Sequence, residues 1–225
     1  KGKNILIFED SCESQGAKFK NKKVGNFGVA SSFSFYWGHH LTTIEGGMIV
    51  TNNKKFYEMC LLKRSHGLAR ELPKKLHPLI KRKFKNIDFK FLFLSSGFNL
   101  RNTEINAYLG RFQLPQINKW IKIRNQNYNK FYQICLKYKS ELFITNNSGI
   151  SSFVLPFIFK NRIKKIKFEK FLIKNKIETR PLIAGNLLKQ PFLSKYKNID
   201  LKNSTFIHRN ALYIGNNQFV NSERM

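Results

Sequence analysis

Short apolar runs alternate with polar, glycine-containing segments over the first 52 residues, and this alternation sets the expected fold class. The runs occupy residues 4–9, 29–36 and 48–52. Apolar runs of this length between turn residues predict strands. The run at 4–9, which ends at Asp10, is typical of a buried parallel strand. We therefore expect the chain to begin with part of an α/β fold.

Helical periodicity follows the predicted strands. Apolar residues spaced as on one face of a helix cover 54–66, and Gly67 is expected to end that helix. A longer periodic stretch opens at Thr103 and Glu104, is interrupted near Pro115 and runs to about Tyr138. The basic, aromatic segment between these helices, up to Ser95, predicts no regular element and is interpreted as a lid or an irregular insertion.

The second half of the chain has its own succession of elements. Residues 153–159 predict a strand, 165–176 a helix and 177–183 another strand. A strand, a helix and a strand in this order predict a small α/β domain from about residue 125 onward.

The amino-acid composition limits which classes of protein this chain can belong to. A chain of 225 residues that is 42% hydrophobic can bury a core and form one or two domains. No run of about 18 apolar residues predicts a membrane span, and no signal peptide is visible, although the chain begins at Lys1. The widely spaced Cys12, Cys60 and Cys135 form neither a zinc pattern nor a disulfide framework. We expect a reduced, cytoplasmic setting and no metal site.

The net charge of +28 has two interpretations. It can indicate a polyanionic partner, in which case the chain would be a non-catalytic polyanion-binding protein. It can instead reflect a drift of composition towards lysine, asparagine, isoleucine and phenylalanine. The lysines are spread along the whole chain, and the densest basic runs, 74–90 and 160–176, alternate with apolar residues as solvated amphipathic elements do. We favour a solvated surface and expect no nucleic-acid partner.

Several polar residues lie where ligands bind in α/β proteins. Asp10 follows the first predicted strand, and open sheets place ligand groups at the carboxyl ends of their strands. A carboxylate there can pair with a protonated pyridine nitrogen, or it can cap the next turn. Ser32 and Ser34 can bind phosphate through their hydroxyls. His39 and His40 lie between an aromatic strand end and the turn Glu45-Gly46-Gly47, and histidine carries protons readily near neutral pH.

Seven ordered segments together resemble a known family. They read EDSCESQGA, VGNFGVASSFSFY, TTIEGGMIVTN, RSHG, GFNLRNTEINAYLGRFQL, ETRPLIAGN and YIGNNQF. They are similar to the DegT/StrS family of fold-type-I pyridoxal-phosphate enzymes that act on nucleotide sugars. The resemblance implies an α/β fold: part of a cofactor-binding large domain with a mixed, mainly parallel sheet over 1–124, then a small C-terminal domain over 125–225. It also implies that an N-terminal part and a final helix of the family are missing, so that this piece alone is expected to be inactive.

The resemblance gives His39 a specific meaning. In aminotransferases of the family the segment SFYWGHHLTTIEGG carries, at the position of His39, the lysine that binds the cofactor covalently. No lysine occurs between Lys23 and Lys54, and an imidazole cannot replace a primary amine in that bond. A His-for-Lys subgroup of the family consists of sugar 3-dehydratases, in which pyridoxamine phosphate is held without a covalent bond and the histidine moves protons. The resemblance therefore implies a nucleotide-linked 4-keto-6-deoxyhexose 3-dehydratase of deoxysugar or lipopolysaccharide biosynthesis.

Other roles follow from the resemblance. Cofactor-binding residues would be Asp10 against the pyridine nitrogen, Glu13 near the ring where aminotransferases usually have Gln, Ser34 on the phosphate, and Asn99 on the cofactor phosphate of a neighbouring subunit in a homodimer. Residues facing the sugar or the donor carboxylate would be Arg180, Asn186, His40 and His208, with packing as the alternative for His40. Glutamate would be the amino donor.

Two alternatives within the family stay open. One is a pyridoxal-phosphate-dependent sugar aminotransferase that works without the lysine, against which His39 argues. The other is an iron–sulfur dehydratase of the same subgroup, which needs four cysteines close together. Three separated cysteines do not match that pattern, and Cys12 is interpreted as a small packed residue.

Overall fold

The computed structural model describes residues 5–145, 148–196 and 199–220. The chain divides into two compact units, which are described separately. Unit 1 comprises residues 1–15 and 22–115, and unit 2 comprises 16–21 and 116–225. This division falls at Pro115, close to the interruption expected in the long helix. The domain boundary after residue 124 stays a prediction.

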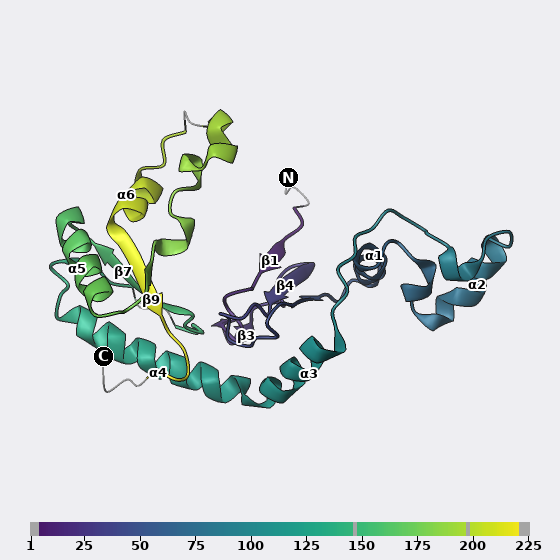
Figure 1. The fold of residues 1–225 in the computed structure, drawn as a ribbon, viewed down its shortest axis with the longest axis horizontal. Coiled ribbons are helices and arrows are strands. Elements are labelled where there is room, and N and C mark those ends of the chain that lie inside the picture. Colours follow the sequence, from purple (N-terminus) through teal and green to yellow (C-terminus); the bar gives the residue numbers. More distant parts are fainter. Residues whose placement is uncertain (1–4, 146–147, 197–198, 221–225) are drawn as a thin grey trace. The chain divides into compact units, whose positions relative to one another are not determined.

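The elements follow one another along the chain as drawn in Figure 1. The strands are β1 (Phe8–Asp10), β2 (Lys18–Phe19), β3 (Lys22–Lys23), β4 (Ala30–Ser34), β5 (Gly47–Val50), β6 (Leu142–Phe143), β7 (Val154–Phe159), β8 (Thr179–Arg180) and β9 (Ala211–Gly215). The α-helices are α1 (Lys54–Arg64), α2 (His77–Lys83), α3 (Glu104–Gln113), α4 (Ile117–Leu136), α5 (Arg162–Lys174) and α6 (Lys202–Asn210). Short 3-10 helices are η1 (Ala69–Glu71), η2 (Lys74–Leu76), η3 (Phe89–Phe91), η4 (Leu114–Gln116), η5 (Leu182–Ala184), η6 (Leu187–Lys189) and η7 (Pro191–Tyr196). None of the helices in the described part of the chain is long and apolar enough to cross a membrane.

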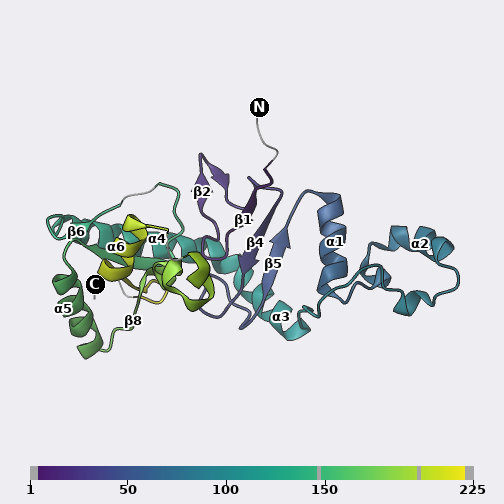
Figure 2. The same cartoon turned by 90° about the horizontal axis from the view of Figure 1, so that it is seen from above.

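Unit 1 contains a mixed sheet in the order β1-β4-β5 (Figure 2). Strand β1 runs parallel to β4, with Asp10 opposite Ser32, and β4 runs antiparallel to β5, with Ser34 opposite Gly47. The three strands predicted over the first 52 residues are therefore confirmed, although each is shorter than its apolar run. The burial expected for the first strand is wrong in this chain, because Phe8 and Asp10 on β1 are exposed and Glu9 is half-buried.

The predicted helix over 54–66 is confirmed as α1. Its first turn is capped by Asn53, whose side chain accepts a hydrogen bond from the Phe56 N–H at 3.0 Å. It ends before Gly67, which has φ +86°, and a Cβ at that position would lie 1.7 Å from the carbonyl oxygen of Ser95. Only glycine fits so close an approach in this backbone conformation.

The basic segment up to Ser95, for which we predicted no regular element, folds into short helices. It forms η1, η2, α2 and η3 around four buried side chains, Leu68, Ala69, Leu72 and Leu92. Backbone hydrogen bonds from Ala69 N to Leu92 O (2.9 Å) and from Leu94 N to Gly67 O (2.8 Å) close its base. The segment is thus an ordered part of unit 1.

The long periodic stretch from 103 is a helix interrupted at Pro115, as predicted. Thr103 caps α3 by accepting from the Asn106 N–H at 3.3 Å. The 3-10 turn η4 contains Pro115, which lacks the N–H that a continuous helix needs, and α4 continues to Leu136.

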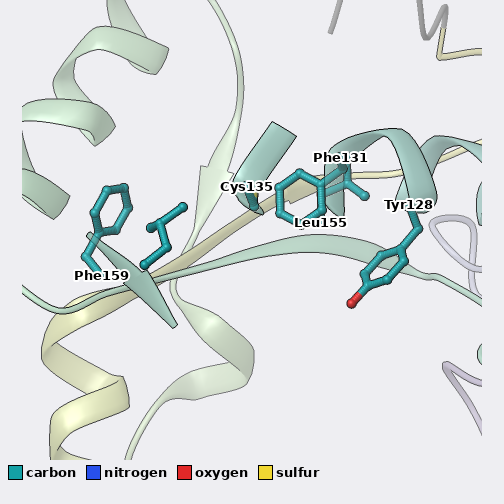
Figure 3. Close-up of a cluster of buried hydrophobic side chains, with 6 residues drawn as sticks. Tyr128, Phe131, Cys135, Leu155 and Phe159 are labelled. Atoms are coloured by element: carbon teal, nitrogen blue, oxygen red, sulfur yellow. The ribbon is translucent and has the colours of Figure 1, made fainter. Parts of the chain in front are cut away.

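Unit 2 is built on an antiparallel sheet in the order β6-β7-β9-β8, packed against α4 and α5. Figure 3 shows the core: Tyr128, Phe131 and Cys135 project from α4 towards Leu155 and Phe159 of β7. Aromatic rings add edge-on contacts, such as Phe131 against Phe157 at 5.0 Å between ring centroids. The predicted strand at 153–159 and helix at 165–176 are confirmed as β7 and α5.

The strand predicted over 177–183 is mostly wrong. Strand β8 has only two residues, and Pro181 follows it directly. Since proline cannot donate a hydrogen bond to a neighbouring strand, the chain leaves the sheet there and turns into η5.

Candidate functional site

The loop between β4 and β5 carries the two histidines. Its base is closed by hydrogen bonds from Phe35 N to Gly46 O (2.9 Å) and from Thr43 N to Phe35 O (2.8 Å). Within the loop, the His39 N–H donates to Tyr36 O at 3.0 Å, and the Tyr36 ring stands edge-on to the His39 ring at 5.6 Å. His39 is half-buried.

Asp10 ends β1 and lies within electrostatic range of His39. Its Oδ1 accepts from the Cys12 N–H at 3.2 Å and from the Ser32 hydroxyl at 3.4 Å. Hydrogen bonds from the Cys12 side chain and backbone lower the pKa of Asp10. The Ser32 hydroxyl and the charge of His39 lower this pKa further, and together these effects outweigh the slight desolvation of the carboxylate, which raises it. The carboxylate is therefore held ionised beside the proposed proton carrier.

Ser34 ends β4, two residues beyond Ser32, the residue opposite Asp10 in the sheet. Its hydroxyl accepts from the Tyr36 N–H at 3.2 Å, and its carbonyl oxygen accepts from the side-chain amide of Gln15 at 2.8 Å. Gln15 is itself buried. These contacts fix the strand end that presents the Ser34 hydroxyl.

Glu9 supports the site from the other side of β1. Its carboxylate accepts from three backbone N–H groups, those of Gly25 (2.7 Å), Phe27 (2.6 Å) and Gly28 (2.7 Å). Successive side chains of a strand point to opposite faces, so Glu9 anchors the loop before β4 while Asp10 faces the site. The sequence reasoning missed Glu9 and Gln15, because a carboxylate or amide that binds a distant backbone leaves no spacing signal.

Cys12 is more than a packed small residue. It is half-buried, and its Sγ lies 3.6 Å from the Ser32 hydroxyl oxygen. Together Cys12 and Ser32 surround the Asp10 carboxylate. The interpretation of Cys12 as packing alone is therefore incomplete.

Three further residues predicted for the site lie elsewhere in unit 1. Glu13 is exposed on the turn after β1. His40 is only 1% exposed, which favours packing over contact with a substrate. Asn99 is exposed and pairs with Ser65 in an isolated antiparallel bridge, and its Oδ1 accepts from Arg101 Nε at 3.4 Å. The roles of Glu13, His40 and Asn99 stay predictions.

Arg180, Asn186 and His208 belong to unit 2. Arg180 is exposed on β8, and its guanidinium contacts the Glu178 carboxylate at 2.8 Å, which raises the pKa of Arg180. Asn186 is buried: its side chain donates to the Thr205 hydroxyl at 2.9 Å and accepts from the Leu188 N–H at 3.0 Å. Its backbone N–H donates to His208 Nδ1 at 3.3 Å, so Asn186 and His208 do lie together. Their substrate roles stay predictions, and Asn186 has a structural role in capping η6.

The residues around β1 and β4 fit a phosphorylated pyridine cofactor. An ionised carboxylate at one strand end suits a protonated ring nitrogen, and a hydroxyl at the neighbouring strand end suits a phosphate oxygen. Unit 1 offers no lysine between Lys23 and Lys54, so a covalent bond from this loop to a cofactor aldehyde has no donor. Among the described residues, no group of three or more His, Cys, Asp or Glu side chains could hold a metal ion.

Comparison with known proteins identifies relatives of the whole chain. It is 35% identical over 230 residues to GDP-4-keto-6-deoxy-D-mannose 3-dehydratase of Escherichia coli O55:H7, a match that covers 96% of the chain and 58% of the relative. The enzyme of the same name from Yersinia pseudotuberculosis is 30% identical, with 100% and 58% covered. The solved structure of GDP-4-keto-6-deoxymannose-3-dehydratase with a trapped PLP-glutamate geminal diamine superposes with a TM-score of 0.83 at 30% identity, over 99% of the chain and 59% of that structure.

The chain thus spans 58% of the length of these two curated relatives. The similar solved structure shares the fold of unit 1 and unit 2 along nearly the whole chain. A family model described as the DegT/DnrJ/EryC1/StrS aminotransferase family matches residues 1–225. This chain belongs to the DegT/DnrJ/EryC1/StrS aminotransferase family.

Proposed function

We propose that the protein to which this chain belongs is a nucleotide-sugar 3-dehydratase that uses pyridoxamine phosphate. The substrate class is a nucleotide-linked 4-keto-6-deoxyhexose, and GDP is the nucleotide named for the relatives with 35% and 30% identity. The observation that carries the proposal is His39: it occupies the loop after β4, within electrostatic range of Asp10, where an aminotransferase of the family would carry a lysine.

In this proposal the cofactor supplies the reactive groups, and the residues of unit 1 bind it and transfer protons. When bound, pyridoxamine phosphate supplies the amine that reacts with the sugar ketone and the ring that accepts electrons. Asp10, kept ionised by Cys12 and Ser32, binds and orients the ring nitrogen, and the Ser34 hydroxyl binds the phosphate. His39 accepts and returns a proton at an imidazole nitrogen, which is the role of a general acid and base.

Three partners belong to the same proposal. Glutamate is the amino donor, supported by the relative that was solved with PLP and glutamate trapped together. The protein is a homodimer in which Asn99 of one subunit binds the cofactor phosphate of the other. It works in the cytoplasm, which is consistent with the free thiols of Cys12, Cys60 and Cys135.

The test is to weigh the product. The full-length protein, supplied with pyridoxal phosphate and glutamate, is given a GDP-4-keto-6-deoxyhexose, and the sugar is analysed by mass spectrometry. We expect a product that has lost the C3 oxygen and gained no nitrogen. We expect His39→Asn to abolish that product, with a loss of about a hundredfold or more in kcat. His77→Asn, which removes a histidine of α2, serves as the matched control.

Two results would contradict the proposal. An aminated sugar that retains its C3 oxygen would show an aminotransferase, and another residue would then have to supply the amine chemistry. Full dehydratase activity in His39→Asn would remove His39 from the reaction.

A further inference from the structure

The loop that carries His39 is held by helix α3 as well as by its own base. Gln113, at the end of α3, forms two reciprocal hydrogen bonds with the backbone of Thr42. The Thr42 N–H donates to Gln113 Oε1 at 3.1 Å, and Gln113 Nε2 donates to Thr42 O at 2.7 Å. A side-chain amide used in this way replaces the partner that a neighbouring strand would provide.

Asn106, two turns earlier on α3, forms hydrogen bonds with the next residues of the same loop. Its Nδ2 donates to Thr43 O and, at 3.0 Å, to Glu45 O. The Thr103 hydroxyl, which caps α3, donates to Asn106 Oδ1. That bond fixes the orientation of the amide, so that its NH₂ group faces the loop rather than the helix cap.

The two amides lie on one face of α3, with Gly110 between them. Residues 106, 110 and 113 follow the helical spacing that places side chains on a common face. A Cβ at Gly110 would lie 3.1 Å from Thr43 Cγ2, so the glycine lets the helix approach the loop. Figures 1 and 2 show α3 below the sheet strands of unit 1, at the end where this loop emerges.

We infer that Asn106 and Gln113 are positioning residues for His39. Together they bind the backbone of Thr42, Thr43 and Glu45, the part of the loop that begins two residues after His40. The short span from His39 to Thr42 is closed at its other end by the bond from His39 N to Tyr36 O. Both ends of the segment bearing the imidazole are thus fixed, and a displacement of about 1 Å in a catalytic group can cost a hundredfold in rate.

The first test reads the position of His39 without using activity. The imidazole resonances of His39 are assigned in the full-length protein by comparison with His39→Asn. We expect Gln113→Ala to shift or broaden these resonances. Gln116→Ala, which truncates an exposed glutamine just beyond α3, should leave them unchanged. Asn106→Asp is the second variant: it keeps the acceptor for Thr103 and loses the donors to the loop, with almost no change in shape.

The second test separates rate from binding, and it rests on the proposed function. In the dehydration assay we expect Gln113→Ala and Asn106→Asp to lower kcat by about tenfold to a hundredfold, with KM changed by less than about twofold. A residue that only supports folding would lower the amount of active enzyme and leave the His39 resonances of the folded fraction unchanged.

The outcomes are distinguishable. Unchanged His39 resonances in both variants would overturn the inference, and so would shifted resonances with an unchanged kcat. If the wild-type protein does not dehydrate the sugar, the proposed function fails, whereas the resonance comparison still decides whether α3 positions His39.

Discussion

At the scale of single residues, the two adjacent carboxylates of β1 have different roles. Asp10 faces the site, and Glu9 binds the N–H groups of Gly25, Phe27 and Gly28. Partial burial raises the pKa of Glu9, but the three backbone hydrogen bonds and the nearby Lys22 outweigh it, so the pKa lies below its ordinary value of 4.5. Because the folded-state pKa is lowered, Glu9 stabilises the fold above its unfolded pKa, and that contribution is lost as the pH falls through the folded pKa.

Glu9→Gln should therefore destabilise the protein in a pH-dependent way. We expect a loss of about 1 kcal/mol at neutral pH, since an amide cannot accept from all three donors and turns one of its own donors towards them. The loss should shrink as the pH falls from 4.5 through the lower folded pKa. Urea unfolding at a series of pH values measures it, and Glu45→Gln, at an exposed carboxylate, is the control. A difference that does not vary with pH would contradict the assignment.

At the scale of elements, a buried polar network joins α4 to the chain that follows β9. Arg124 is 3% exposed and donates to the carbonyl of Asn216, and burial lowers the pKa of Arg124 to about 10. The Asn216 side chain donates to Arg124 O (2.9 Å) and to the Ser152 hydroxyl (3.0 Å), and accepts from Asn127 (3.1 Å). One asparagine thus binds polar groups of two other segments of unit 2, α4 and the residues just before β7.

Asn216→Ala should be strongly destabilising. It leaves the Asn127 amide and the Arg124 carbonyl without these partners in a buried place, and we expect a loss of about 2–3 kcal/mol in the free energy of unfolding. Asn129→Ala, at an exposed position of α4, should cost less than about 0.5 kcal/mol. Denaturant unfolding measures the loss of unfolding free energy in each variant. Equal losses in the two variants would show that the network contributes little to stability.

The elements also show how far sequence reasoning reaches. Local patterns predicted α1, the interrupted helix at Pro115, β7 and α5, because capping residues, proline and apolar periodicity act over a few residues. They did not predict the short β8, where Pro181 outweighs the apolar run. They also missed the helices between Gly67 and Ser95, which are held by contacts distant in sequence, such as the bond from Ala69 N to Leu92 O. Asp10, Ser34 and His39 were candidates from their places in the sequence, and the family resemblance supplied their specific roles. Gln113 and Asn106 were missed because their partners are backbone groups more than 60 residues away.

At the scale of the whole molecule, the excess of positive charge has little local order. The chain carries 41 basic and 13 acidic side chains, which gives a net charge of +28. Exposed cations occur in both units, and some lie over aromatic rings, as Lys81 does over Phe89 at 4.9 Å. A dispersed excess of this kind attracts polyanions without selecting among them.

We therefore expect binding to nucleic acid to be weak, non-selective and sensitive to salt. Affinity for duplex DNA of random sequence should fall by about a hundredfold or more between about 50 mM and 200 mM salt. Fluorescence anisotropy with two unrelated sequences measures this, and both should behave alike. Tight, sequence-selective binding that persists at the higher salt concentration would instead support a polyanion-binding function.

Glu9 and Asp10 point to opposite faces of β1, and each has its own hydrogen-bond partners there. This pair therefore helps to specify the register of the strand. A slip of one residue would turn Glu9 towards the site and move Asp10, a shorter side chain, to the three N–H groups of the loop before β4. That misregistered sheet would lose the hydrogen bonds from Gly25, Phe27 and Gly28 and would misplace the charge of Asp10. The same pair of residues therefore favours the correct register of the sheet and sets where the Asp10 carboxylate lies, so a slipped register would cost stability as well as move that charge.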